Sequence, residues 1–388
     1  MNNLFSRAMS KAKHLTISGK LHAATALIQS VLAKGQGSPA AAGADDAIDG
    51  KFTRLADAPP AAAPSGAARR AHKASGSPRS PLAETLRKIA AGGMPRKAPR
   101  PAGPVEVPEG ARFLALTHTS AQGSRDYRLY LPANHPDGRL PLVVMLHGCT
   151  QTPEDFATGT GMNALAEEFG CLVAWPAQPA GANVQKCWNW FRPQDQARDL
   201  GEPALIAGLT RDILRDHSAD PARVYVAGLS AGGAAAAIVA MAYPEIFSAV
   251  GVHSGLAVGG AWDVPSAFAA MRSGAPGKIG LPTVPTICFH GTADATVHAG
   301  NGTAVLDQAL HCRPGLRVGV EQGTAPGGRR FRRTHHRGDD GRTEAELWEV
   351  DGAGHAWAGG QAGGSYTDPA GPDASREMLR FFRQHARI

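Results

Sequence analysis

Apolar and polar residues recur along residues 109–388 in the two spacings that are typical of strands and helices. The clearest strand is the uninterrupted apolar run at residues 142–146, Leu-Val-Val-Met-Leu, as expected of a buried central strand. Further strands are predicted at residues 113–117, 127–131, 171–175, 223–227, 249–253, 286–289 and 347–350. Helices are predicted at residues 203–217, 231–243, 299–310 and 375–386. This alternation predicts an α/β domain with a mostly parallel sheet and helices on both faces.

The first 108 residues follow a different pattern. Residues 3–33 predict two short helices around Ser18 and Gly19, and the second helix has one apolar face. That face consists of Leu21, Ala24, Leu27, Ile28, Val31 and Leu32. Residues 34–108 are rich in Ala, Pro, Gly, Lys and Arg, with too little apolar surface to offset the entropy lost on ordering. We therefore expect an amphipathic helical segment at 1–33, a disordered basic linker at 34–108 and one folded domain at 109–388.

Charge separates these regions further. The chain has a formal net charge of +7, and residues 1–110 hold 16 Lys and Arg against 7 Asp and Glu. Residues 111–388 hold 24 against 26, so the basic character belongs to the N-terminal arm. A basic arm favours an anionic surface such as lipid, acidic protein or nucleic acid, and it suits a solubilising linker equally well.

The N-terminus and the cysteines bear on targeting, membrane insertion and metal binding. Basic residues open the chain, but no clean apolar run follows them, so we expect no signal peptide. No apolar stretch reaches 18 residues, so we expect no transmembrane segment. The five cysteines, Cys149, Cys171, Cys187, Cys288 and Cys312, show no metal-ligand spacing, and their odd number leaves at least one thiol free. We expect no bound metal.

Residues 228–232 read Gly-Leu-Ser-Ala-Gly, between a predicted strand and a helix of small residues. This G-x-S-x-G context is that of the nucleophile elbow, a tight turn that lifts the Ser hydroxyl above the sheet. Positions two residues away on either side must lack bulk, and both are Gly. We therefore predict Ser230 as a catalytic nucleophile in an α/β-hydrolase fold.

A nucleophilic serine requires a base and an acid that orients the base. His355 lies in a glycine-rich loop after the strand at 347–350, and it is the predicted base. The orienting acid should lie between Ser230 and His355 in the chain. Asp294 follows a buried strand and is our candidate; Asp307, within a helix, and Asp351 are its rivals.

An oxyanion hole requires two backbone N–H groups directed at the developing negative charge. One is predicted at Ala231, directly after the nucleophile. The other is predicted at Cys149, in the His147-Gly148 turn that follows the strand at 142–146. We expect His147 to hold this loop by side-chain hydrogen bonds, and we also count it among the residues that line the substrate site.

Residues 185–191 read Gln-Lys-Cys-Trp-Asn-Trp-Phe and are dense in aromatic side chains. Trp188 and Trp190 form either an apolar wall that binds the ester chain or the packed core of a loop. Cys149 and Cys187 both fall in loops predicted near the nucleophile, so we hypothesise a disulfide between them.

With these residues identified, the sequence resembles the polyhydroxybutyrate (PHB) depolymerase family of esterases, which includes some feruloyl and acetylxylan esterases. The resemblance extends from about Phe113 to the C-terminus. Its motifs lie at residues 146–151, 187–191, 228–233, 251–256, 354–357 and 365–375. It implies a cofactor-free acyl-enzyme mechanism on an ester of a hydroxyalkanoate, and by matching position it supports Ser230, Asp294 and His355.

The resemblance also frames the expectations for substrate and location. Secreted depolymerases of this family usually carry a signal peptide and a polymer-binding domain after the catalytic domain, and neither is recognised here. We therefore expect a cytoplasmic enzyme, associated with polyhydroxyalkanoate granules through its N-terminal arm, with secretion as the alternative. The partners expected are the polyester or ester and the granule surface, without nucleic acid. Two alternatives to polyester hydrolysis are a small-ester or feruloyl-type esterase and a granule-associated binding protein.

Overall fold

A computed structural model describes residues 105–133, 138–281 and 283–387 of the chain. The helical segment predicted at residues 1–33, and the predicted linker up to residue 104, lie outside the described residues. The domain predicted to begin near residue 109 contains every element described below.

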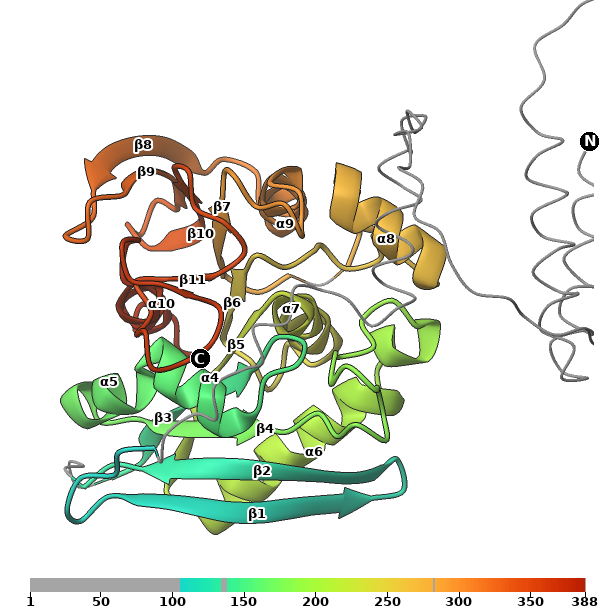
Figure 1. Cartoon of the computed structure of the whole chain (residues 1–388), viewed down its shortest axis with the longest axis vertical. Helices are drawn as coiled ribbons and strands as arrows, with labels where there is room; N and C mark the ends of the chain where they lie inside the picture. Colours follow the sequence, from blue (N-terminus) through green and yellow to red (C-terminus); the bar gives the residue numbers. More distant parts are fainter. Residues whose placement is uncertain (1–104, 134–137, 282, 388) are drawn as a thin grey trace, which may run out of the picture. The chain divides into compact units, whose positions relative to one another are not determined.

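Ten strands form one sheet in the order β1-β2-β4-β3-β5-β6-β7-β10-β9-β8 (Figure 1). They are β1 (Arg112–Ser120), β2 (Gly123–Leu131), β3 (Leu140–Leu146), β4 (Leu172–Pro176), β5 (Ala219–Leu229), β6 (Ala249–His253), β7 (Thr286–Gly291), β8 (Arg317–Thr324), β9 (Arg330–Arg337) and β10 (Thr343–Val350). The six central strands, β4 to β10 in that order, are parallel, and antiparallel pairs flank them on both sides. The mostly parallel sheet predicted from the sequence is therefore confirmed.

Helices cover both faces of this sheet. They are α4 (Pro153–Thr160), α5 (Met162–Phe169), α6 (Gly201–Asp216), α7 (Ala231–Ala242), α8 (Val264–Ser273), α9 (Gly300–Leu310) and α10 (Ala374–Phe382), with a 3₁₀ turn, η1 (Pro193–Gln196). None of the helices in the described ranges has the length and apolar content needed to cross a bilayer. The last helix ends at Phe382, before the predicted end at residue 386. Beyond it, the ring of His385 donates an N–H to the Thr343 carbonyl, 3.0 Å away.

The apolar residues of the sheet alternate between two cores. In β3, Leu142, Val144 and Leu146 face the core under α6 to α9, whereas Val143 and Met145 face the core under α4, α5 and α10. All five side chains are fully buried. A strand buried on both sides needs apolar residues at every position, which is why this segment reads as a continuous apolar run.

The sequence pattern missed the helices α4, α5 and α8 and the β8–β9 hairpin. The helices have 8 to 10 residues, too few turns for a clear 3.6-residue period. The hairpin lies at one end of the sheet, and its edge strand β8 buries none of its side chains. Its partner β9 carries four arginines, so neither strand shows the apolar alternation on which strand prediction depends.

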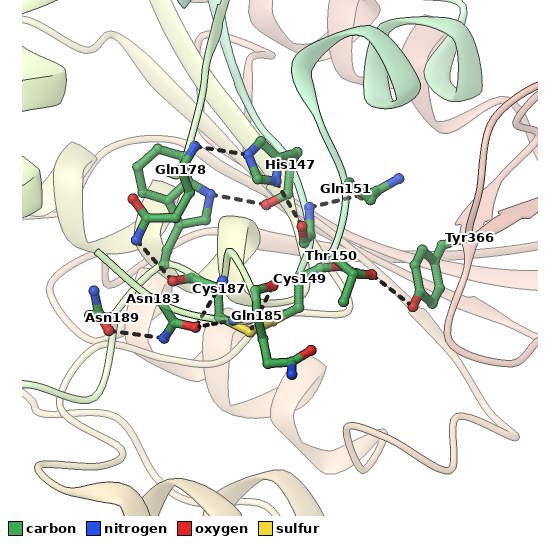
Figure 2. Close-up of a disulfide and its surroundings, with 12 residues drawn as sticks. His147, Cys149, Thr150, Gln151, Gln178, Asn183, Gln185, Cys187, Asn189 and Tyr366 are labelled. Atoms are coloured by element: carbon green, nitrogen blue, oxygen red, sulfur yellow. Dashed lines mark hydrogen bonds between the residues drawn. A yellow bond between two sulfur atoms is a disulfide. The ribbon is translucent and has the colours of Figure 1, made fainter. Parts of the chain in front are cut away.

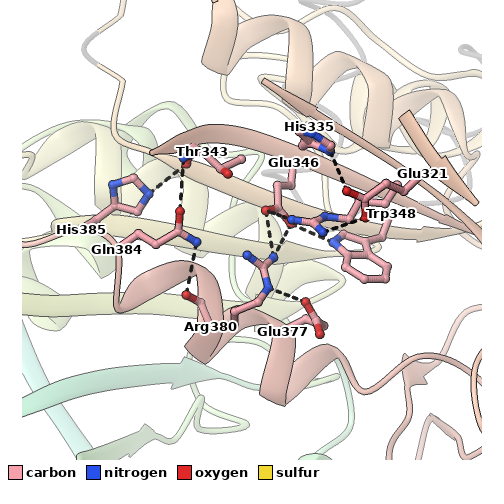
Figure 3. Close-up of polar contacts among 10 residues, drawn as sticks. Glu321, His335, Thr343, Glu346, Trp348, Glu377, Arg380, Gln384 and His385 are labelled. Atoms are coloured by element: carbon pink, nitrogen blue, oxygen red, sulfur yellow. Dashed lines mark hydrogen bonds and ion pairs between the residues drawn. The ribbon is translucent and has the colours of Figure 1, made fainter. Parts of the chain in front are cut away.

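A buried carboxylate ties the hairpin to the rest of the sheet (Figure 3). Glu346 of β10 is fully buried and binds the guanidinium groups of Arg333 in β9, at 2.7 Å, and Arg380 in α10, at 2.6 Å. Trp348 Nε1 donates to the same carboxylate at 3.0 Å. Burial alone would raise the pKa of Glu346, but the two arginines hold the pKa below its ordinary value. The two guanidinium groups thus offset the cost of burying the charged Glu346 carboxylate in the core.

Candidate active site

The loops that leave the carboxyl ends of β3, β5, β7 and β10 carry the residues predicted for catalysis. Parallel strands align these ends along one edge of the sheet, and functional sites in open α/β sheets gather there. β3 pairs with β5, and β7 pairs with β10, so two of the loop pairs are direct neighbours.

Ser230 lies in the turn between β5 and α7 and is partly exposed. Its φ of 58° and ψ of −119° are strained for a residue with a side chain. Its backbone N–H donates to the His253 carbonyl at 2.8 Å. A Cβ at Gly232 would lie 2.1 Å from the Leu146 oxygen, and one at Gly228 would lie 2.3 Å from the Gly232 oxygen. The two glycines of the motif are therefore required by close backbone approach, as a nucleophile elbow demands.

His355 and Asp294 meet across the loops after β10 and β7. His355 Nδ1 lies 2.7 Å from Asp294 Oδ2, and the Asp294 side chain is fully buried. Asp294 Oδ1 accepts the backbone N–H groups of Thr296 and Val297, at 2.8 and 2.9 Å. Burial alone would raise the pKa of Asp294, but these hydrogen bonds, first among them that of His355, hold the pKa below its ordinary value. An ionised Asp294 accepts the Nδ1 proton of His355, which leaves Nε2 free to accept another.

The two rival acids lie elsewhere. Asp351 is exposed and pairs with Arg330 at 2.7 Å. Asp307 is exposed on α9. The structure therefore brings Asp294, and neither rival, to the ring of His355.

Cys149 offers the free backbone donor that an oxyanion hole needs. The neighbouring N–H of Gly148 donates to Gln151 Oε1 at 2.9 Å, and the N–H of Thr150 donates to a carbonyl of the adjacent loop at 2.7 Å. The N–H of Cys149 has no acceptor among the described residues. Ala231 begins α7, where the first N–H groups of a helix have no partner within it. Both predicted donors are thus available to a ligand.

A disulfide links Cys149 to Cys187, as hypothesised from the sequence (Figure 2). It joins the loop after β3 to the loop after β4, across a sequence separation of 38. The other three cysteines are free: Cys171 and Cys288 are buried and Cys312 is exposed. The disulfide anchors the residue whose N–H is the candidate oxyanion donor.

His147, Trp188 and Trp190, which we expected to line the substrate site, are packed inside the loop instead of forming an exposed wall. The three residues are 1%, 0% and 6% exposed, so they belong to the core of the loop. Trp188 Nε1 donates to the His147 carbonyl at 3.0 Å, and His147 Nε2 accepts the N–H of Gln178 at 3.1 Å. Burial lowers the pKa of His147 to about 4, so this histidine is neutral. Large rings gain more free energy from burial than from partial exposure at a rim, which favours the packed-loop alternative.

A second buried carboxylate, Glu202, holds the loop after β4, which carries Cys187. Glu202 accepts Gln178 Nε2 at 2.5 Å and the backbone N–H of Asn189 at 2.8 Å. Gln178 Nε2 also donates to the Cys187 carbonyl at 2.9 Å. Burial raises the pKa of Glu202, with the nearby Asp195 adding to the shift. These contacts fix one end of the disulfide to the body of the domain.

Sequence reasoning missed His253, which supports the loop of the predicted base. Its Nε2 accepts the backbone N–H of Ala358 at 2.9 Å, and its ring stacks on Trp357 at a centroid distance of 4.9 Å. Burial lowers the pKa of His253 to about 3, which keeps Nε2 unprotonated and able to accept. The sequence shows that His253 ends a predicted strand, but no residue near it in the chain indicates that its ring accepts a hydrogen bond from Ala358.

Comparison with known proteins identifies the family of the chain. The model of the esterase PHB depolymerase family matches residues 125–319, half of the chain. Poly(3-hydroxyalkanoate) depolymerase C of Paucimonas lemoignei is 32% identical over 259 residues, covering 62% of this chain and 61% of its own. Feruloyl esterase B of Neurospora crassa is 32% identical over 117 residues, covering 30% and 39%.

The chain thus spans less than two thirds of the length of these curated relatives. In structure, the acetyl xylan esterase of Aspergillus awamori aligns with a TM-score of 0.54 and 18% identity, over 71% of this chain and 99% of its own. This likeness shows the α/β-hydrolase fold predicted from the nucleophile motif. From the family match over half of its length, we conclude that the chain belongs to the PHB depolymerase family of esterases.

Proposed function

We propose that this protein is a serine hydrolase that cleaves carboxylic esters through an acyl-enzyme. The observation that carries the proposal is the hydrogen bond from His355 to the buried Asp294, on loops at the same sheet edge as the strained Ser230. In this mechanism Ser230 Oγ attacks the ester carbonyl and His355 Nε2 takes the hydroxyl proton. The N–H groups of Cys149 and Ala231 stabilise the oxyanion.

His355 serves the rest of the reaction first as an acid and then as a base. His355 gives the proton to the leaving alcohol, which completes acylation. In deacylation His355 takes a proton from the attacking water and returns it to Ser230 Oγ as the acyl group leaves as a carboxylic acid. Asp294 holds the ring of His355 with Nδ1 protonated throughout. No step requires a cofactor.

We propose poly(3-hydroxyalkanoate) or its oligomers as the substrate, because the similarity to depolymerase C extends over more of the chain than the similarity to feruloyl esterase B. The latter similarity supports the second candidate, an esterase of small or feruloyl-type esters. Two assays separate these functions: hydrolysis of p-nitrophenyl butyrate and clearing of a suspension of native polyester granules. Activity in both assays supports the depolymerase, whereas activity on the soluble ester alone supports the second candidate.

Ser230→Ala is expected to lower kcat in both assays by about 10⁴- to 10⁶-fold, because the nucleophile is lost while the fold remains. A thermal melt that matches the wild type confirms that the variant is folded. Retention of more than about a tenth of the activity would refute Ser230 as the nucleophile, since triad removal costs far more.

The N-terminal arm gives the substrate proposal a second test. We propose that residues 1–104 dock the enzyme on the polyester granule, supported by the apolar positions of residues 21–32 and the basic linker sequence. A shortened chain that begins at Val105 is expected to keep full activity on p-nitrophenyl butyrate and to lose granule binding. Equal sedimentation of both chains with granules contradicts the docking role.

We propose, finally, that the protein works in an oxidising compartment, so that the polyester granules on which its N-terminal arm docks lie outside the cytoplasm. The disulfide between Cys149 and Cys187 supports this, since cytosolic thiols are kept reduced, and it favours the secreted alternative over the cytoplasmic location expected from the N-terminus. Fractionation of the producing cells tests the proposal. Recovery from the cytoplasm with both cysteines reduced contradicts it.

A further inference from the structure

Tyr366 lies where two loops of the candidate site meet. Its backbone carbonyl accepts the N–H of Trp357 at 2.7 Å, two residues beyond the predicted base His355. Its hydroxyl lies 3.2 Å from Thr150 Oγ1, next to the oxyanion residue Cys149 (Figure 2). One residue thus connects the loop of the base to the loop of the oxyanion hole.

The direction of the hydroxyl contacts follows from counting hydrogens. Thr150 Oγ1 donates its single hydrogen to the Cys149 carbonyl, which can only accept, at 2.6 Å. The hydrogen between Tyr366 and Thr150 therefore comes from the tyrosine. The hydrogen bonds therefore run in one direction, from the Tyr366 hydroxyl to Thr150 Oγ1 and from Thr150 to the Cys149 carbonyl. The N–H of Cys149 is free to bind an oxyanion.

Both hydroxyl residues have strained backbones. The φ of Thr150 is 67° and that of Tyr366 is 53°, a region that disfavours residues with a Cβ, and β-branched ones most. Such strain persists where the surroundings fix the conformation. Here Asp155 accepts the N–H of Ser365 at 2.9 Å, and Gln151 Nε2 donates to the Ser365 carbonyl at 3.1 Å. The residue before Tyr366 is thus bound to the same segment that carries Thr150.

Tyr366 as a residue is 40% exposed, in contrast to the buried Trp188 and Trp190. Burial therefore does not account for its conformation. An exposed aromatic face held beside the oxyanion loop suits contact with the apolar chain of an ester.

We propose that Tyr366 is a positioning and specificity-determining residue of this enzyme. Its hydroxyl aligns the Cys149 N–H through Thr150, and its exposed ring contacts the substrate chain. This inference rests on the proposed ester hydrolysis. The hydroxyl acts on transition-state stabilisation and therefore on kcat, whereas the ring acts on substrate binding and therefore on KM.

Two hydroxyl deletions test the positioning role with p-nitrophenyl butyrate. Tyr366→Phe and Thr150→Val are each expected to lower kcat about tenfold, less than the loss of an oxyanion donor itself, with KM and the melting temperature unchanged. The double variant is expected to match the single ones, because each change breaks the same series of hydrogen bonds. Thr150→Ser, which retains the hydroxyl, is expected to restore most of the kcat lost in Thr150→Val.

A ring deletion and a control complete the test. Tyr366→Ala is expected to raise KM about fivefold in addition to the loss of kcat, a change on the scale of one lost apolar contact. Thr119→Val removes an exposed hydroxyl on β1 and is expected to leave both constants unchanged. A kcat of Tyr366→Phe within twofold of the wild type, or losses that multiply in the double variant, would overturn the inference. An inactive wild type would instead overturn the proposed ester hydrolysis and this inference with it.

Discussion

At the residue scale, the candidate site depends on a few side chains whose surroundings decide their charge. Asp294 is buried yet ionised, because three hydrogen-bond donors surround its carboxylate. His253 is buried and neutral, which lets its ring accept a backbone N–H that holds the loop of the base. The charge of each group is therefore set by its burial together with its hydrogen-bond partners.

Replacing Asp294 by Asn tests the acid. We expect Asp294→Asn to lower kcat by about 10⁴-fold, because the amide stabilises the wrong tautomer of His355 and leaves its protonated form without a counter-charge. Asp351→Asn, the matched control, is expected to stay within twofold, because the Asp351 side chain bonds only to the exposed Arg330. Steady-state rates on a soluble ester measure both. A greater loss in Asp351→Asn than in Asp294→Asn means that the acid is misassigned.

At the element scale, the site is a set of loops that cross-links hold in place. The loop after β3 is bound by the Cys149–Cys187 disulfide, by Gln151 and, from the far side, by Tyr366. The strands set where each loop leaves the sheet, and these links hold the part of the loop that lies away from the sheet. Loops placed this way can present backbone N–H groups with the accuracy that an oxyanion hole requires.

Removing the disulfide tests this anchoring. We expect Cys149→Ser with Cys187→Ser to lower the free energy of unfolding by about 3–4 kcal/mol, the loop-closure entropy for a separation of this length. We also expect kcat to fall, because the Cys149 N–H loses its anchor. Cys312→Ser, which removes an exposed free thiol, is expected to change neither. Urea unfolding measures the stability.

Thiol labelling checks the disulfide itself. Alkylation of the unfolded, non-reduced protein is expected to modify Cys171, Cys288 and Cys312 only. Labelling of all five cysteines in mass spectra means that the disulfide is absent.

At the scale of the whole molecule, three buried histidines make stability depend on pH. Burial lowers the pKa of His253 to about 3 and the pKa values of His147 and His385 to about 4. Each of them titrates near pH 6.5 in the unfolded chain. The stability they contribute is complete above pH 6.5 and is lost as the pH falls toward 4, by about 1.4 kcal/mol per pH unit for each histidine.

Proton uptake on unfolding measures this effect directly. At pH 5.5 we expect the protein to bind protons as it unfolds in urea, about one for each of these three histidines, and His290, whose pKa burial also lowers, adds to the uptake. The acids Asp195 and Glu202 act in the opposite direction, because burial raises their pKa values in the folded protein. The His385→Asn variant is expected to take up about one proton fewer on unfolding than the unchanged chain does. An uptake below one proton in the unchanged chain contradicts the assignment.

Local sequence sufficed where the physical cause was itself local. The central strand at residues 142–146 is apolar at every position because both of its faces are covered. The turn at Ser230 requires glycines two residues away on either side, because any Cβ there would meet backbone atoms. The α/β-hydrolase fold and the place of the nucleophile were therefore predictable from short segments alone.

Side-chain partners far apart in sequence followed only from the folded chain. His355 finds Asp294 rather than the nearer Asp351 because β7 and β10 pair in parallel and bring their loops together. Trp188 is buried rather than exposed because the fold closes over its loop. Tyr366 reaches Thr150 across 216 residues. Periodicity and turn chemistry report the neighbours of a residue along the chain, whereas burial and hydrogen-bond partners depend on which strands pair and which loops they align.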